Sequence, residues 1–404
     1  MLGDSANLGS VKVSRWRYVI ASVVINLCLG AVYAFSFLVP PLEQQFGWKR
    51  IETSPAFTIA LLTFALSMIP AGRLQDKKGP KAAASLGGLL LGWGMILSSF
   101  TDSLASLYIS YGLIAGLGIG FAYGAPIATC TKWFPDKKGL ATGLVVFGFG
   151  GGAIIFAPFW AFMIGACNWS STFLVTGLLF MALAVSAAQV LRNPRPDYKP
   201  AGWSPPVKSA AVRKDLEPAE MVRTPAFFLM WVTYWLGTTA GLMTIGQAKL
   251  VAMELAHIEP DTASLAVSIL GGFNAAGRLM WGFLGDRLER EKMLIADFAI
   301  CFVALIILST IFEPLIFIIG LSLVGLCFGG FLALYPALTS DRYGAKNLGI
   351  NYGIVFTAYG GGSVLGPTMA SYFRTFHGSY LPAFYIAAVL ALTGVLVTFL
   401  LKKG

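Results

Sequence analysis

Long runs of apolar residues, separated by short polar segments, follow one another along almost the whole chain. An α-helix needs about 20 mainly apolar residues to cross the hydrocarbon core of a bilayer. Runs of this kind form two sets of six, at residues 17–40, 54–72, 82–101, 104–129, 139–164, 171–191, 226–250, 263–284, 293–312, 315–337, 348–371 and 380–401. The pattern predicts an all-α integral membrane protein with twelve transmembrane helices.

The composition agrees with this prediction and excludes a soluble enzyme. Of the 404 residues, 56% are hydrophobic and 12% are charged, and the mean hydropathy is +0.73. The net charge of +10 would favour nucleic-acid binding in a soluble protein, but in a membrane protein basic residues set the orientation. We therefore expect no nucleic-acid partner. The five cysteines lie in apolar stretches without paired spacing, so neither a metal site nor a disulfide framework is indicated. No cofactor is implied.

The basic residues gather on one side of the predicted spans. Of the 29 Lys and Arg residues, 24 fall on the side that also holds both termini, and only Lys49, Arg50, Lys249 and Arg374 fall on the other. By the positive-inside rule, both termini are expected in the cytoplasm, with the protein spanning the inner (plasma) membrane several times. The Pro-rich, charged segment 192–225 is interpreted as a cytoplasmic linker between an N-terminal six-helix bundle, 1–191, and a C-terminal one, 226–404.

The two halves of the chain repeat each other. A shift of 210 residues, without a gap, superposes a Gly, an Asp, a Pro and a Gly triplet of the first half on identical residues of the second. The pairs are Gly72 and Gly282, Asp76 and Asp286, Pro126 and Pro336, and residues 150–152 and 360–362. Because each half has an even number of helices, the sequence predicts two parallel six-helix repeats, with a substrate site expected between them.

Two motifs resemble those of a known transporter family. The segment GRLQDKKGPK at 72–81 is similar to the Gly-x-x-x-Asp-basic-x-Gly-x-basic loop of the major facilitator superfamily, and 282–290 repeats it with Glu289 in place of the Gly. The segment WFPDKKGLATG at 133–143 resembles one in oxalate/formate antiporters and, more loosely, in monocarboxylate porters. The resemblance implies a secondary transporter whose two loops latch the cytoplasmic side. The gating residues expected from it are Asp76, Arg73, Lys77, Asp286 and Arg287.

Arg278 is the main candidate for substrate binding. It precedes Asp286 by eight residues, hence about 12 Å at 1.5 Å per residue into the eighth span. A charge there costs at least about 2.5–3.5 kcal/mol on insertion scales. No Asp or Glu is expected deep in any span, since Asp297 falls at the cytoplasmic end of the ninth. Arg278 either caps backbone carbonyls or pairs with Asp297, or it forms an anion site that binds a substrate carboxylate through its planar fork.

Asn274 and Tyr359 refine the expected substrate. Asn274 lies four residues before Arg278 on the same helix face, where it orients the guanidinium, binds substrate or contacts a neighbouring helix. The monocarboxylate porters have an acidic residue at its position, so their usual proton acceptor is replaced here. The oxalate/formate antiporters have a Lys at the position of Tyr359, so this chain keeps one of their two cations. The resemblance therefore favours a small monocarboxylate, such as lactate or pyruvate, over a dicarboxylate.

Aromatic residues at positions that match the substrate cavity of that family complete the candidate site. They are Tyr33, Tyr123, Phe149, Tyr335, Phe356 and Tyr359. Such rings exclude water and strengthen the attraction between Arg278 and a carboxylate, and the phenols add hydroxyl donors. The alternative for each of them is ordinary packing between helices.

The sequence therefore favours a proton-coupled symporter of small monocarboxylates that works by alternating access. Its expected partners are a small carboxylate anion, a proton and the lipid bilayer. The alternatives are anion exchange of the oxalate/formate type and, from another class, a receptor that keeps the transporter fold. An enzyme is not expected, because no Ser/His set, carboxylate pair or metal-ligand set lies at membrane depth.

Overall fold

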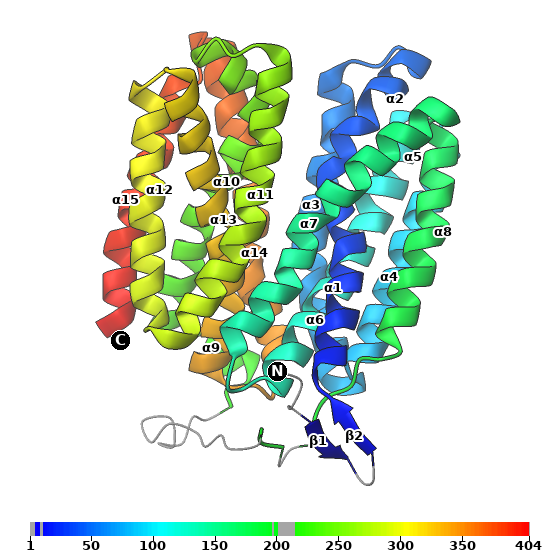
Figure 1. Ribbon diagram of the computed structural model, residues 1–404, viewed down its shortest axis with the longest axis vertical. Coiled ribbons are helices and arrows are strands. Elements are labelled where there is room, and N and C mark those ends of the chain that lie inside the picture. Colours follow the sequence, from blue (N-terminus) through cyan, green and yellow to red (C-terminus); the bar gives the residue numbers. More distant parts are fainter. Residues whose placement is uncertain (1–4, 9–10, 196–197, 201–214, 404) are drawn as a thin grey trace. The chain divides into compact units, whose positions relative to one another are not determined.

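The computed structural model describes residues 5–8, 11–195, 198–200 and 215–403 (Figure 1). The chain divides into two compact units, which are described separately. The first comprises residues 1–221 together with 336–354, and the second comprises 222–335 together with 355–404. Much of the predicted linker, at 196–197 and 201–214, lies outside the described residues.

The helices follow the predicted order from the N-terminus to the C-terminus. The elements before the linker are β1 (Ser5–Leu8), β2 (Val11–Ser14), α1 (Trp16–Gly30), the 3₁₀ segment η1 (Ala31–Phe37), α2 (Val39–Phe46), α3 (Arg50–Lys78), α4 (Pro80–Ser98), α5 (Leu104–Leu107), the π-helical segment η2 (Tyr108–Ala115), α6 (Gly116–Trp133), α7 (Lys138–Ala166) and α8 (Trp169–Ala188). Those after it are α9 (Pro218–Met221), α10 (Pro225–Leu255), α11 (Pro260–Arg287), α12 (Arg290–Thr310), α13 (Pro314–Tyr343), α14 (Leu348–His377) and α15 (Leu381–Lys403).

These elements account for all twelve predicted spans. In the described part of the chain, 10 helical segments are long and apolar enough to cross a membrane. The other two predicted spans are α11, of 28 residues, and α14, of 30 residues. The predicted twelve helices are therefore present. The short antiparallel hairpin β1–β2, in which Ser5 lies opposite Ser14, was not predicted.

Several helices extend beyond the apolar runs from which they were predicted. The predicted bounds follow the apolar residues, whereas a helix continues through polar residues until its backbone is capped or broken. The Thr224 hydroxyl accepts a hydrogen bond of 3.2 Å from the backbone N–H of Phe227 and caps α10. The Asn168 side chain accepts one of 2.7 Å from Ser171 N–H and caps α8 in the same way.

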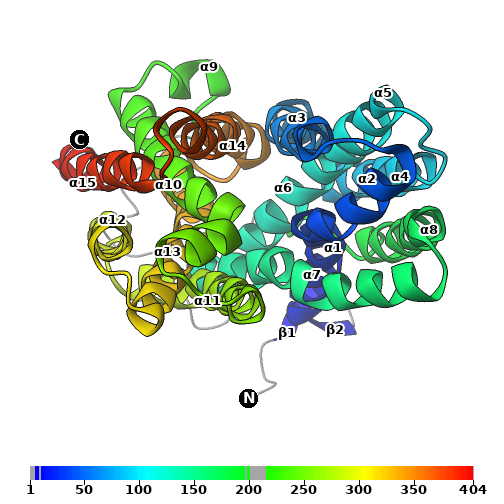
Figure 2. The same cartoon turned by 90° about the horizontal axis from the view of Figure 1, so that it is seen from above.

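Small residues let the helices of the first unit approach closely. Helix α4 packs against α6 and α8, α1 packs against α7, and α3 against α6 (Figure 2). Where α4 crosses α6, a Cβ added to Gly87 would lie 2.7 Å from the carbonyl oxygen of Gly118, and one added to Gly118 would lie 2.8 Å from that of Gly87. Only a glycine fits on either side of this crossing, as in other membrane helix pairs.

In the second unit, α12 packs against α15, and α10 packs against α11 and α15. Its core contains Phe298 of α12, whose ring centroid lies 4.6 Å from that of Phe331 of α13. A Cβ added to Gly394 of α15 would overlap the Phe298 ring, so the absent side chain makes room for this ring. The residue before Phe298 is Asp297, which is also buried.

Candidate functional site

Arg278 lies on α11, nine residues before the helix ends at Arg287, and its side chain is 0% exposed. Its Nε donates a hydrogen bond of 3.0 Å to Oδ1 of Asn274, one helical turn earlier. This contact fixes the plane of the guanidinium, because Nε is part of the planar group. One of the roles expected for Asn274, orienting the guanidinium, thus has a direct geometric basis.

The backbone beneath Arg278 is held by a close helix contact. Gly329 of α13 packs against the carbonyl oxygen of Asn274, and a Cβ added to it would also lie 2.9 Å from the backbone nitrogen of Arg278. Any larger residue at 329 would push α11 and α13 apart. The position of the guanidinium thus depends on a glycine that the repeat pattern did not single out.

The carboxyl of Asp297 lies deeper in its helix than the sequence predicted. Asp297 was expected at the end of its span, but α12 begins at Arg290, so Asp297 lies two turns inside the helix and is 0% exposed. Within the described residues, no N–H group donates a hydrogen bond to either of its carboxyl oxygens, and the polar group beside them is the Cys327 thiol. The hydrogen-bonded Arg278–Asp297 pair, considered as an alternative role for Arg278, is therefore not formed.

The second unit also brings together the predicted aromatic residues of α13 and α14. The ring of Tyr335 stacks on that of Tyr234 of α10, with centroids 4.1 Å apart. The Phe356 ring lies 6.1 Å from that of Tyr234 and 4.8 Å from that of Tyr359. Tyr234, which joins the predicted residues, was not identified from the sequence. Helix α10 carries several aromatic residues, and no spacing distinguished this one.

Three of the predicted aromatic residues form a cluster in the first unit. Phe149 of α7 makes edge-on contacts with Tyr33 of η1, at 5.4 Å between centroids, and with Tyr123 of α6, at 5.1 Å. Phe64 of α3 completes the cluster at 5.7 Å from Phe149 and 5.0 Å from Tyr123. Phe64 was missed because it lies in a uniformly apolar run. Tyr33 is half-buried and the other three residues are buried.

The loop motif of the first half contacts the start of α14 inside the first unit. The Asp76 carboxylate accepts hydrogen bonds from the backbone N–H groups of Gly349, at 3.2 Å, and Ile350, at 2.8 Å. These are orphan donors of a helix N-terminus, where the helix dipole favours a negative charge. Arg73 and Lys77, two other predicted gating residues, have exposed side chains.

Glycines make this contact between α3 and α14 possible. The backbone of Gly72 packs directly on that of Gly349. One turn further along α14, a Cβ added to Gly353 would lie 2.5 Å from the carbonyl oxygen of Met68. The 210-residue repeat also relates these α14 glycines to Gly139 and Gly143, and the structure shows that their spacing serves a backbone-to-backbone contact.

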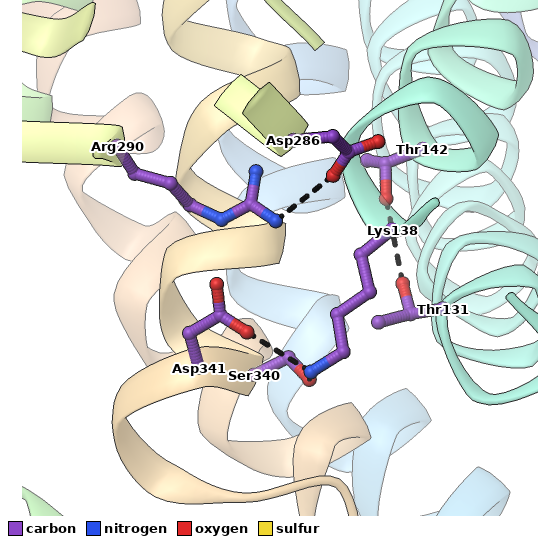
Figure 3. Close-up of polar contacts among 7 residues, drawn as sticks. All are labelled: Thr131, Lys138, Thr142, Asp286, Arg290, Ser340 and Asp341. Atoms are coloured by element: carbon purple, nitrogen blue, oxygen red, sulfur yellow. Dashed lines mark hydrogen bonds and ion pairs between the residues drawn. The ribbon is translucent and has the colours of Figure 1, made fainter. Parts of the chain in front are cut away.

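Two further sets of polar contacts hold the same end of the first unit. Lys138 of α7 donates hydrogen bonds to Asp341, at 2.9 Å, and to the Ser340 hydroxyl, at 3.3 Å, as Figure 3 shows. The backbone carbonyl of Leu216, at the end of the linker, accepts hydrogen bonds from Asn347, at 3.2 Å, and Asn351, at 3.1 Å. These contacts were not predicted from the sequence, since they join residues more than 130 positions apart.

The loop motif of the second half makes a different set of contacts. Asp286 forms an ion pair of 3.1 Å with Arg290 one turn later (Figure 3), and the Arg287 guanidinium lies over the Phe283 ring at 4.1 Å. Glu289, which replaces the motif glycine, pairs with Lys292 and Lys402, each at 3.2 Å. Hydrogen bonds from these two lysines hold the pKa of the Glu289 carboxyl below its ordinary value.

The motifs, the repeat and the fold define a membrane transporter of one superfamily. A profile of the Major Facilitator Superfamily matches residues 21–255 and 226–403, so the chain belongs to this family. The fold agrees. The structure of the transporter FucP in its outward conformation has a TM-score of 0.73 at 16% identity, covering 95% of this chain and 98% of that one.

Individual relatives confirm the narrower resemblance as well. The oxalate:formate antiporter of Oxalobacter formigenes is 30% identical over 396 residues, covering 96% of this chain and 92% of the antiporter. The uncharacterized MFS-type transporter YhjX of Escherichia coli (strain K12) is 30% identical over 355 residues, covering 87% and 86% of the two chains. Monocarboxylate transporter 12 of Mus musculus is 25% identical over 401 residues, covering 92% and 82%.

Proposed function

We propose that the protein is a secondary active transporter of small monocarboxylates of the lactate or pyruvate type, working by proton-coupled symport and alternating access. The observation that carries the proposal is the position of Arg278, a fully buried cation on a membrane helix, held in one orientation by Asn274. Burying a charge in this environment is costly, and such residues generally mark substrate or ion pathways.

The geometry around Arg278 favours a single carboxylate as its ligand. Asn274 takes up the Nε–H, so a carboxylate that binds in this conformation meets the end of the guanidinium formed by Nη1 and Nη2. That edge offers two parallel N–H groups with the spacing of two carboxylate oxygens. The aromatic residues Tyr335, Phe356 and Tyr359 on the same unit suit a short, partly apolar substrate.

Anion exchange is the second candidate function. It is favoured by the 30% identity to the oxalate:formate antiporter over 96% of this chain. Against it stands Tyr359, since the antiporters that this helix resembles carry a Lys at the matching position. With one cation in place of two, a dicarboxylate would keep one charge uncompensated in a buried site.

The proposed substrate anchor is tested by replacing Arg278 in protein reconstituted into liposomes. Arg278→Gln is expected to abolish saturable uptake of labelled L-lactate, because the neutral amide removes the charge and the fork. Arg278→Lys is expected to restore only part of the affinity, since an ammonium is a point charge without the bidentate geometry. Arg374→Gln is the matched control, because Arg374 is an exposed residue at the end of α14, paired with Glu254. Full uptake by folded Arg278→Gln protein would refute the proposal.

A further inference from the structure

Asp297 is a buried acidic residue that the substrate site proposed above does not use. Its side chain is 0% exposed, and among the described residues no N–H group donates a hydrogen bond to either carboxyl oxygen; the polar group beside the carboxyl is the weakly donating thiol of Cys327. Its Oδ2 packs on the backbone of Gly330 of α13, in the place that a Cβ would take. The glycine therefore opens the space that the carboxyl fills.

The groups around this carboxyl are apolar or only weakly polar. The Trp281 ring of α11 packs on the same glycine, and its indole Nε1–H is also buried without a hydrogen-bond partner among the described residues. The titratable groups that interact with the carboxyl are the thiols of Cys301 on α12 and Cys327 on α13, and the phenol of Tyr335 on α13. None of these groups is a cation.

The charged groups of the neighbouring elements have contacts elsewhere. At the start of α12, Arg290 pairs with Asp286 of α11. On α15, which packs along α12, Lys402 pairs with Glu289, and Tyr385 donates a hydrogen bond to the carbonyl of Ser309 at the opposite end of α12. Arg278 of α11 bonds Asn274 and forms no hydrogen bond with Asp297. In the described part of the chain, an ionised Asp297 would thus be a buried anion without a paired cation, and such a group binds a proton instead.

The carboxyl is also close to the elements that carry the proposed substrate anchor. Trp281 and Arg278 are three residues apart on α11, and therefore on adjacent positions of one helix face. Their contacts on α13 are two consecutive residues, because Gly329 packs on the backbone at Asn274 and Arg278, and Gly330 packs on Trp281 and Asp297. A shift of α11 against α13 that accompanies substrate binding at Arg278 would therefore change the surroundings of Asp297.

We propose that Asp297 is the proton-binding residue of the transport cycle, protonated in the conformation described here and deprotonated when movement of α11 against α13 admits water to it. This inference rests on the proton coupling proposed above. The only covalent change is at the carboxyl O–H bond, which forms with a proton from water on one side of the membrane and breaks by returning it to water on the other. Asp297 thereby takes the role that an acidic residue at position 274 has in the monocarboxylate porters.

The variant Asp297→Asn distinguishes two roles of Asp297, that of a proton carrier and that of a buried structural group. The amide has the shape of the protonated acid but cannot release a proton. The exposed acidic residue Asp261, at the start of α11, provides the matched control Asp261→Asn. In liposomes, the wild type and the control are expected to show faster L-lactate uptake under an inward proton gradient. Asp297→Asn is expected to lose this stimulation while it still exchanges labelled for unlabelled L-lactate at equal pH.

The outcomes distinguish this inference from the proposed function. If the wild type responds to the proton gradient and Asp297→Asn responds equally, the role of Asp297 is refuted and symport stands. If the wild type does not respond, the proposed coupling fails, and the role of Asp297 fails with it. Where the variant does not fold, infrared spectra of wild-type protein labelled with carbon-13 in its Asp carboxyl groups decide the question. A protonated Asp band that changes on L-lactate binding supports the proposal, and its absence overturns it.

Discussion

Replacing Asn274 with Leu is expected to weaken substrate binding without removing the charge that attracts the substrate. In the wild type, Nε of Arg278 donates a 3.0 Å hydrogen bond to Asn274 Oδ1 inside a fully buried environment. The Leu side chain has a similar volume but accepts no hydrogen bond. The variant leaves the Nε–H without this acceptor, and the guanidinium loses the contact that sets its plane.

The magnitude follows from the kind of hydrogen bond that is lost. A hydrogen bond to a charged group contributes about 1.5–3 kcal/mol, and this range corresponds to roughly 10- to 150-fold in affinity. The apparent KM for L-lactate in liposomes is expected to rise by a factor in this range, with a smaller change in the maximal rate. Asn26→Leu is a matched control, because Asn26 is another buried Asn, on α1, that bonds its own helix at Ser22.

The result that would refute this reasoning is an unchanged KM in correctly folded Asn274→Leu protein. The guanidinium would then be oriented by other contacts, and the Nη1/Nη2 edge would not be selected by Asn274. A rise in KM that also appears in Asn26→Leu would instead indicate a general loss of packing. Circular dichroism and gel filtration of each purified variant establish that the compared proteins are folded.

Three further predictions concern the packing and charges outside the substrate site. Single and double Ala variants of Lys138 and Asp341 are expected to give a coupling energy of about 0.2–1 kcal/mol in chemical unfolding, since the pair is partly exposed. A coupling energy of zero would mean that the pair does not stabilise the fold. Gly353→Ala is expected to lower Tm because its Cβ would crowd a backbone carbonyl. Gly165→Ala should leave Tm unchanged, because no atom lies within 4 Å of its Cβ. Equal Tm values for the two variants would contradict the close contact at Gly353. Because the pKa of Glu289 is lowered, its ion pairs stabilise the protein at pH values above the ordinary pKa of 4.5, and this stabilisation is lost as the pH falls through the lower pKa of the folded state. The Tm difference between the wild type and Glu289→Gln should therefore shrink in acid. A Tm difference that does not depend on pH would count against the ion pairs.

The sequence alone predicted the number and order of the helices, because hydrophobic runs of membrane-spanning length are a strong signal. The two helices with the weakest apolar signal, α11 and α14, were also predicted from their apolar runs. The ends of the helices were less accurate. They depend on caps such as Thr224 and Asn168, which hydropathy does not detect.

The candidate site was predictable only where a residue was unusual for its surroundings. Arg278 stood out as a charge within an apolar run, and Asn274 followed from helical spacing. Phe64 and Tyr234 were missed, because aromatic residues are common in such helices and only the folded chain places them against the predicted rings. Asp297 was assigned to a helix end, because its burial depends on the earlier start of α12 and on Gly330, a residue of a different helix.

The central claim is most directly tested by measuring uptake of labelled L-lactate into liposomes that contain the purified protein. The measurement compares an inward proton gradient, equal pH on both sides, and equal pH with oxalate or formate preloaded inside. Proton-coupled symport predicts that the gradient drives accumulation of L-lactate with no anion inside. Uptake that occurs only with an internal anion, and that ignores the proton gradient, would contradict the account and identify the protein as an exchanger.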